Sequence, residues 1–330
     1  MPYTQLNQLD FGNIKTALKE YMRSQTDFTD YDFEGSALAP LIDVLAYNTY
    51  YTAFDTNMVV NEMFLDSATL RDNVVALAKQ LGYRPKSATA SKAVVNVTLA
   101  YTSPNAPATA ILRRGKAFTA LFDNTVYQYS VLDDVRVPVN NGNAVLENVE
   151  IYSGNIVTDY HTVNATLRNQ RYLLNNQNID TTTIRVKVFQ SAQSSAFELY
   201  DYAENILNVD PQSKVFFLTE IEDENYEIKF GDGVFGRKLE DGEYIEISYL
   251  TTPGPTTNGA KVFSFNGLLE DPDTTTQTLN SLTVTVMNLT TVSASSGGEN
   301  SETLDRIKFN AAKNYATQDR AVQQKTTRQL

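Results

Sequence analysis

The sequence contains no cysteine and only one histidine, His161, in 330 residues. The absence of cysteine excludes disulfides and thiol chemistry, and a single histidine excludes nearly every zinc or iron site built from His and Cys side chains. His161 lies in a Thr-rich segment, and no G-x-S-x-G sequence is present to supply a nucleophile, so a surface histidine is favoured over a catalytic one. We predict no catalytic, cofactor-binding or metal-binding residue, and no enzyme activity.

Tryptophan, long apolar runs and an excess of basic charge are also absent. No apolar run approaches the roughly eighteen residues that a membrane span needs. Lysine and arginine number 27 against 39 acidic residues, a formal net charge of −12, which disfavours wrapping nucleic acid because such binding depends on neutralised phosphates. We expect neither a membrane nor nucleic acid as a partner, and we expect a soluble protein made in the cytoplasm.

Basic side chains gather at two places, Arg113, Arg114 and Lys116 in one and Arg168 and Arg171 in the other. We predict that both places are strand edges whose charged side chains face solvent and discourage aggregation.

Residues 1–90 show a helical period. Apolar side chains recur on one face within 14–22, within a longer segment from Leu38 toward Asn61, and within 70–81. Ser36 and Ser67 are placed to cap the second and third helices. Gly82, followed by a proline, is placed to end the third.

The second of these helices is unusually aromatic, and its aromatic residues fall on more than one face: Tyr47, Tyr50, Tyr51, Phe54 and the nearby Phe64. One stripe fits an internal core and another fits a surface that a partner covers. The pattern alone leaves both possibilities open.

From about residue 92 to residue 290 the period changes to two, which is typical of strands. The clearest alternating runs are Val95, Val97 and Leu99; Ile184, Val186 and Val188; and Leu282, Val284 and Val286. Residues 295–298, two serines and two glycines, have the composition of a linker, and an acidic helix start follows from Glu302. The predicted class is α+β: a helical domain over 1–90, a mostly antiparallel β-rich domain over 91–292, and a linker with the start of another helix over 293–330.

The segment 226–260 carries the strongest local signals. Tyr226, Ile228 and Phe230 alternate with charged residues, and Ile245, Ile247 and Tyr249 alternate with polar ones, so we predict the two strands of a β-hairpin, each with one buried face. In the link, Gly231, Gly233, Gly236 and Gly242 are predicted to supply positive φ angles, and Asp232 and Asp241 to bond the nearby backbone.

Two ligand-binding interpretations fail because the residues around each motif do not fit. Gly231, Gly233 and Gly236 satisfy G-x-G-x-x-G, but no helix is predicted to start at the last glycine, as a dinucleotide site requires. Asp30, Asp32 and Glu34 imitate the start of a calcium loop, but its twelfth position falls on Leu41, which cannot supply a carboxylate. Structural turns and a helix start are the favoured readings.

These motifs resemble a known family. Phe230 to Gly236, Gly242 to Tyr249 and Asn258 to Ala260 resemble the FGDG core of J-like baseplate proteins of contractile phage tails, and Leu112 to Phe118 resembles the same family with departures at Arg113 and Lys116. The strings DYDFEGS (Asp30, Tyr31, Asp32, Phe33, Glu34, Gly35 and Ser36) and LAYNT (Leu45, Ala46, Tyr47, Asn48 and Thr49) are similar to the baseplate wedge subunit of T-even-type myophages.

The resemblance implies a structural subunit of a tail baseplate wedge, which assembles in the host cytoplasm and ends in the virion. It implies as partners a second copy of the chain, other wedge proteins and the sheath-initiating wedge protein, with amino-terminal helices shared in a bundle. The alternatives are the equivalent subunit of a phage-derived injection system and a carbohydrate-binding or lytic tail protein. The absence of tryptophan for sugar stacking disfavours the last.

The end of the chain departs from the family. Arg320-Ala321-Val322 matches the opening of a further large domain, whereas the family's next residues, TAEDYEAI, are replaced by QQKTTRQL. One set of codons for TAEDYEAI, followed by a G and read with its first base dropped, translates as QQKTTRQL. We therefore expect the last eight residues to be an out-of-frame reading of a truncated carboxy-terminal domain, and a fragment lacking that domain to join a wedge without closing a ring.

Overall fold

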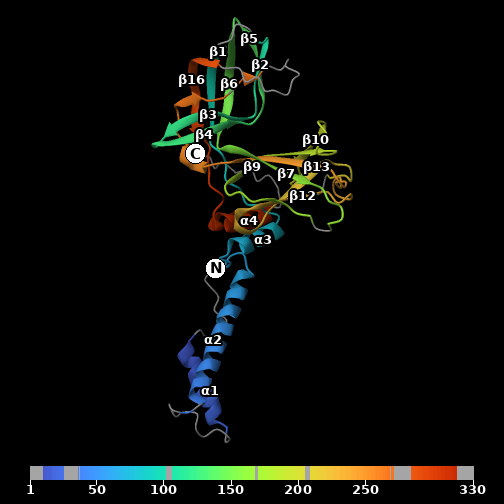
Figure 1. Ribbon diagram of the computed structural model, residues 1–330. Helices are drawn as coiled ribbons and strands as arrows, with labels where there is room; N and C mark the ends of the chain where they lie inside the picture. Colours follow the sequence, from blue (N-terminus) through green and yellow to red (C-terminus); the bar gives the residue numbers. More distant parts are fainter. Residues whose placement is uncertain are drawn as a thin grey trace, which may run out of the picture. The chain divides into compact units, whose positions relative to one another are not determined.

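The computed structural model describes residues 10–25, 36, 38–101, 106–167, 170–204, 209–267, 269–270 and 284–317. The chain forms two compact units (Figure 1), a helical unit from the described residues of 10–85 and 303–317 and a β unit from those of 86–302. The predicted α+β class is confirmed. The DYDFEG string at 30–35, Arg168 and residues 318–330 lie outside the described residues.

The helical unit begins with α1 (Phe11–Arg23) and the longer α2 (Leu38–Glu62). Asp10 caps α1 by accepting a hydrogen bond from the Asn13 N–H at 2.8 Å. Ser36 caps α2 as predicted, because its hydroxyl oxygen accepts from the Leu38 N–H at 3.0 Å. An ion pair between Lys15 and Asp43 joins the two helices.

Helices α3 (Arg71–Gln80) and α4 (Leu304–Thr317) form the core of this unit although they are far apart in sequence. Val74 and Ala78 of α3 pack with Ile307 and Ala311 of α4, and all four are fully buried. The helix predicted from Glu302 onward is thus confirmed and belongs to the helical unit. The further domain predicted to open there stays a prediction.

The prediction that Ser67 caps α3 is wrong. The Ser67 hydroxyl donates to the carbonyl of Asn61 at 2.7 Å, and the Glu62 carboxylate instead accepts from the N–H groups of Thr69 and Leu70 at 2.7 and 3.3 Å. Burial alone raises a carboxyl pKa, but these bonds and others from the Thr69 and Asn73 side chains outweigh burial and lower the pKa of Glu62 to about 2. Glu62 of the preceding helix thus bonds the backbone just before α3, and the N-cap residue Leu70 makes no side-chain capping bond.

One sheet of the β unit has nine strands in the described part of the chain: β1 (Lys92–Tyr101), β2 (Thr109–Leu112), β3 (Gly115–Phe122), β4 (Thr125–Val131), β5 (Val135–Asn140), β6 (Asn143–Ser153), β14 (Phe263–Phe265), β15 (Leu269–Glu270) and β16 (Val284–Ser296). Every pairing in it is antiparallel. The predicted alternation in β1 is confirmed, since Val95, Val97 and Leu99 are buried beside Phe118 and Tyr129. Asn141-Gly142, with φ of 50° and 75°, turns β5 tightly into β6.

The second sheet has seven strands in the described residues: β7 (Asn155–Thr162), β8 (Tyr172–Leu174), β9 (Ile179–Phe189), β10 (Phe197–Tyr202), β11 (Val215–Glu220), β12 (Tyr226–Phe230) and β13 (Tyr244–Thr251). Their order across the sheet is β7-β13-β9-β10-β11-β12-β8. Only the β10–β11 pair is parallel. Two short 3₁₀ helices, Glu222–Glu224 and Gly254–Thr257, lie in the connections.

The predicted hairpin between residues 226–230 and 245–249 is wrong, although both segments are strands. β12 pairs with β11 and β8, whereas β13 pairs with β7 and β9. The connecting segment 231–243 is too long for a tight turn, and it bonds to the β10–β11 connection instead: the Gly236 N–H donates to the Asp210 carbonyl at 3.1 Å, and the Arg237 N–H to the Ser213 carbonyl at 2.8 Å.

The predicted linker at 295–298 is a packed part of the β unit. Ser295 is buried, and its hydroxyl donates to that of Ser91 at 2.8 Å and accepts from Tyr129 at 3.0 Å. A Cβ on Gly298 would lie 2.4 Å from the carbonyl oxygen of Gly254, so glycine serves close packing there rather than flexibility. Composition was a poor guide because small residues also allow close backbone approach.

Candidate functional site

Helix α2 carries a row of exposed, large apolar side chains. Val44, Tyr47, Tyr51, Phe54 and Met58 keep between 40% and 64% of their surface exposed, and they follow one another at alternating steps of three and four residues. We name this row the α2 stripe. Its spacing is that of the a and d positions of a heptad repeat, which pack against a neighbouring helix in coiled coils.

The buried residues of α2 lie on another face of the helix: Ile42, Ala46, Asn57 and Asn61. The stripe is therefore additional to the surface that α2 uses within the helical unit. A contiguous apolar surface of this kind is typical of a protein-binding site.

Two predicted motif residues, Leu45 and Tyr47, are exposed apolar side chains of α2, and Tyr47 belongs to the stripe. The hydroxyls of Tyr47 and Tyr51 are 2.8 Å apart and their rings meet edge to face at 4.6 Å, which holds both rings along the helix. Asn48 is exposed, and its carbonyl accepts from the Thr52 hydroxyl at 2.9 Å. Four residues of the LAYNT string, Leu45, Tyr47, Asn48 and Thr49, are thus exposed, whereas Ala46 is fully buried.

The second set of motif residues forms a closed loop at 230–238, which we name the FGDG loop. Asp232 accepts from the N–H groups of Val234 and Phe235, both at 2.9 Å, as predicted for a local turn. The Gly233 N–H donates to the Gly236 carbonyl at 3.0 Å, and Gly231 forms a parallel bridge with Lys238. The loop therefore returns on itself and presents Val234 and Phe235 to solvent.

The glycines of the loop and the nearby Gly242 serve two different purposes. Gly233, Gly236 and Gly242 have the predicted positive φ, at 93°, 88° and 83°. Gly231 does not, and the prediction for it is wrong: a Cβ there would lie 2.2 Å from the carbonyl carbon of Gly236. Close approach of two backbone segments, rather than a left-handed conformation, requires glycine at this position.

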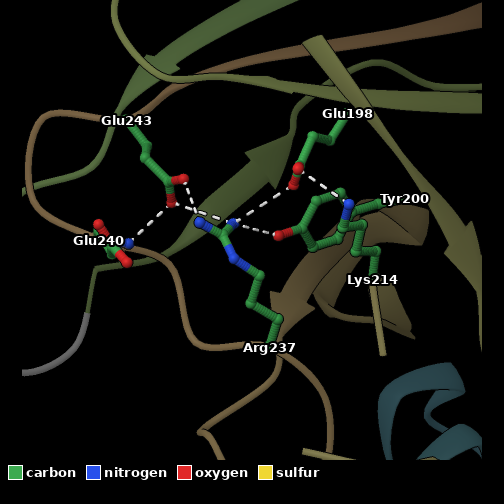
Figure 2. Close-up of polar contacts among 6 residues, drawn as sticks. All are labelled: Glu198, Tyr200, Lys214, Arg237, Glu240 and Glu243. Carbon is green, nitrogen blue, oxygen red and sulfur yellow. Dashed lines mark hydrogen bonds and ion pairs between the residues drawn. The ribbon is translucent and has the colours of Figure 1, made fainter. Parts of the chain in front are cut away.

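Arg237 clamps the loop to the sheet (Figure 2). Its guanidinium donates to Glu243 at 2.6 Å and to the Tyr200 hydroxyl of β10 at 2.5 Å, while Glu243 also accepts from the Glu240 N–H at 2.7 Å. The pKa of Arg237 is raised, mainly by the bond to Glu243. Sequence analysis missed this residue, although it directly follows the last glycine of the loop.

The remaining motif residues lie outside the loop. The Gly242 N–H donates to the Val163 carbonyl at 3.0 Å, and Asp241, predicted to bond locally, accepts from the Ala165 N–H at 2.8 Å instead. Tyr249 is buried in the sheet, where its hydroxyl donates to Asp159 at 2.7 Å and accepts from Asn176 at 2.6 Å. It stabilises the fold and is not part of an exposed site.

The predictions for the basic residues hold in part. Arg113 is exposed and pairs with Asp134 and Glu270 at 2.7 and 2.5 Å, and Arg171 is exposed and pairs with Glu227. Arg114 is instead half-buried and donates to the Ser248 hydroxyl at 2.7 Å; burial, then the nearby Arg185, lower its pKa. The side chain of Lys116 lies outside the described residues.

His161 is half-buried on β7 rather than at the surface as predicted. Its ring meets that of Tyr172 edge to face at 5.4 Å, and burial lowers its pKa. Within the described residues, no group of three or more His, Cys, Asp or Glu side chains has the arrangement of a metal site. None of the described helices has the length and apolarity that a membrane crossing requires.

Comparisons with known proteins agree with the motifs. Residues 10–83 match the family model described as baseplate wedge protein gp6-like, helical domain. Baseplate wedge protein gp6 of Enterobacteria phage T4 is 28% identical to this chain in an alignment 338 positions long, which covers 94% of this chain and 48% of the relative. The chain thus spans about half the length of that relative, and the predicted resemblance to a baseplate wedge subunit is confirmed.

Among solved structures, a chain of the anti-feeding prophage (AFP) baseplate, 6-fold symmetrised, matches 96% of this chain and 62% of its own length. The identity is 13% and the TM-score 0.28, which is too low to support an argument from that structure.

Proposed function

We propose, from the resemblance to baseplate wedge proteins, that this chain is a structural component of a contractile tail baseplate and that the α2 stripe is where its helical unit joins other helices. The proposed partners are a second copy of the chain, other wedge proteins and the sheath-initiating wedge protein. The proposed location is the virion, after assembly in the host cytoplasm. No catalytic step is part of this proposal.

The observation that supports the proposal is the spacing of the α2 stripe. Alternating steps of three and four residues keep Val44, Tyr51 and Met58 in line with Tyr47 and Phe54 along one side of α2. A helix from a partner can interleave its side chains with such a row and bury it. Since burying a large apolar side chain contributes about 1.5–3 kcal/mol, a few stripe residues can determine whether the assembly forms.

The experiment compares two phenylalanines on helix surfaces. Phe54 of the stripe is 43% exposed and Phe309 of α4 is 69% exposed, so serine at either position leaves the cores intact. Phe54→Ser should weaken assembly of purified chain with itself or with wedge partners by about tenfold to a hundredfold, as followed by sedimentation equilibrium. Phe309→Ser should leave assembly unchanged, and circular dichroism should show the same helix content in both variants.

Equal assembly of the Phe54→Ser variant and the unaltered chain would contradict a role for the stripe. The proposed role as a structural component of a tail baseplate is tested separately, by peptide mapping of purified tail particles. Peptides of this chain should be present there in fixed proportion to other baseplate proteins, and their absence would contradict a structural function.

A further inference from the structure

A groove of about 830 Å³ lies in the β unit beside the FGDG loop. Three segments line it: the stretch that follows β7, the end of β12, and the pair Lys238–Leu239. The Gly231–Lys238 bridge is what brings the last pair against the end of β12. The closed form of the FGDG loop therefore builds one wall of the groove, which gives this motif a function beyond its own turn.

The groove is basic although the chain as a whole is acidic, with a net charge of −12. Arg171, Lys229 and Lys238 line it together with one carboxylate, Glu227. Glu227 is buried and is held by Arg171 at 2.6 Å and by Lys229 at 3.1 Å. Three cations against one anion leave an excess of positive charge, and the exposed Lys238 forms no ion pair with any described residue.

The floor and rim of the groove are apolar. Phe230 and Tyr172 meet edge to face in it with ring centroids 5.3 Å apart. Leu167 keeps 57% of its surface exposed at the rim. An occupant can therefore bury an apolar side chain against these rings while its charged groups meet the cations around them.

We propose that this groove binds an extended acidic segment of a partner protein, with an aromatic or aliphatic side chain between its carboxylates. Charge complementarity identifies the occupant: an acidic segment offsets the positive excess, whereas a basic or neutral segment leaves it in place. The site belongs to the β unit, so it is independent of the α2 stripe and does not rest on the proposed function.

The test uses the full chain and a fluorescein-labelled synthetic peptide in which aspartates flank phenylalanine, followed by fluorescence anisotropy. Two comparison peptides carry lysine in place of aspartate, or serine in place of phenylalanine. The acidic aromatic peptide should bind, and both comparison peptides should bind at least about tenfold more weakly. Raising the salt concentration should weaken the binding of the acidic peptide.

Two pairs of variants localise the binding. Lys238→Glu should weaken the peptide complex about five- to tenfold, whereas Lys261→Glu, the same charge change at an exposed residue outside the groove, should not. Leu167→Ser should weaken it, whereas Leu121→Ser, at a leucine that is 65% exposed elsewhere in the β unit, should not. The substituted side chains are exposed, so folding should be unaffected.

Three results would overturn the inference. The first is the same Kd for the Lys238→Glu and Lys261→Glu variants. The second is equal binding of the acidic and basic peptides, or no binding of either. The third is sedimentation in which groove variants change self-association while peptide binding stays the same, because the occupant would then be a second copy of the chain.

Discussion

Replacing Arg237 by alanine should release the FGDG loop from β10 and destabilise the β unit. The change removes the donor to Glu243 and to the Tyr200 hydroxyl together. The Glu243 side chain is only 9% exposed, so it would keep one N–H donor, from Glu240, and lose its counter-charge. A buried carboxylate without a counter-charge strongly lowers the free energy of unfolding.

The magnitude follows from the burial of the pair. Removing one partner of a buried ion pair costs about 3–5 kcal/mol. The Arg237 side chain keeps 22% of its surface exposed, so solvent screens part of the interaction and we expect a loss of about 2–3 kcal/mol in the free energy of unfolding. Arg136→Ala is the matched control, because Arg136 is exposed on β5, and its loss should stay within about 0.5 kcal/mol.

Two assays measure the effect. Urea titration followed by near-ultraviolet circular dichroism gives the free energy of unfolding, and hydrogen exchange reports the loop itself. The N–H groups of Gly233 and Gly236 are bonded only while the loop is closed, so their exchange should become faster in Arg237→Ala than the exchange of β13.

A double-variant cycle completes the test. Arg237→Met with Glu243→Leu removes both charges, so it should cost less than the sum of the single variants by about 1–2 kcal/mol. Additive losses, or an Arg237→Ala variant that unfolds at the same urea concentration as the unaltered chain, would refute the clamp.

Three further outcomes are expected. Gly231→Ala should destabilise the β unit by about 3 kcal/mol or more, because the new Cβ would lie 2.2 Å from backbone. Gly242→Ala, at a φ of 83° with open space around it, should cost only about 1 kcal/mol. Urea unfolding of the two variants measures both losses, and equal losses would contradict this expectation. The pKa of Glu62 is lowered to about 2, so its contribution to stability is present above its ordinary pKa of about 4.3 and is lost as the pH falls toward 2. Glu62→Gln should therefore destabilise the helical unit by about 1 kcal/mol at neutral pH, after allowance for solvent screening, and by less at low pH. Thermal unfolding across that pH range measures the difference, and the same loss at neutral and low pH would show that the bonds to the Glu62 carboxylate do not stabilise the unit. Tyr129→Phe should cost about 1 kcal/mol through the lost bond to Ser295, and an unchanged melting temperature would argue against the buried hydroxyl network.

The local features of the fold were predictable from sequence because neighbouring residues determine them. The start of α2 after Ser36, the alternation in β1 and the positive φ of Gly233, Gly236 and Gly242 depend on steric and hydrogen-bonding rules that act within a few residues. The motifs at Leu45–Thr49 and Phe230–Gly236 also pointed to the baseplate wedge family without the structure. A family motif can be identified from the order and spacing of its residues alone.

The features that sequence analysis missed join residues from distant parts of the chain. Period-two runs identify β12 and β13 as strands, but nothing in either run states which strand lies beside it, and the two are separated in the sheet by β9, β10 and β11. The same holds for the bonds from Glu62 to the backbone just before α3 and for the contact of α3 with α4. Which residues meet in these contacts depends on how the whole unit packs.

The candidate sites divide in the same way. Sequence alone located the aromatic helix and the glycine-rich loop, because composition and spacing mark both. Only the tertiary structure decided that the α2 stripe is exposed, that Arg237 clamps the loop, and that Lys229 and Lys238 share a groove. Exposure and charge balance are properties of a surface, and a surface exists only once distant segments have packed together.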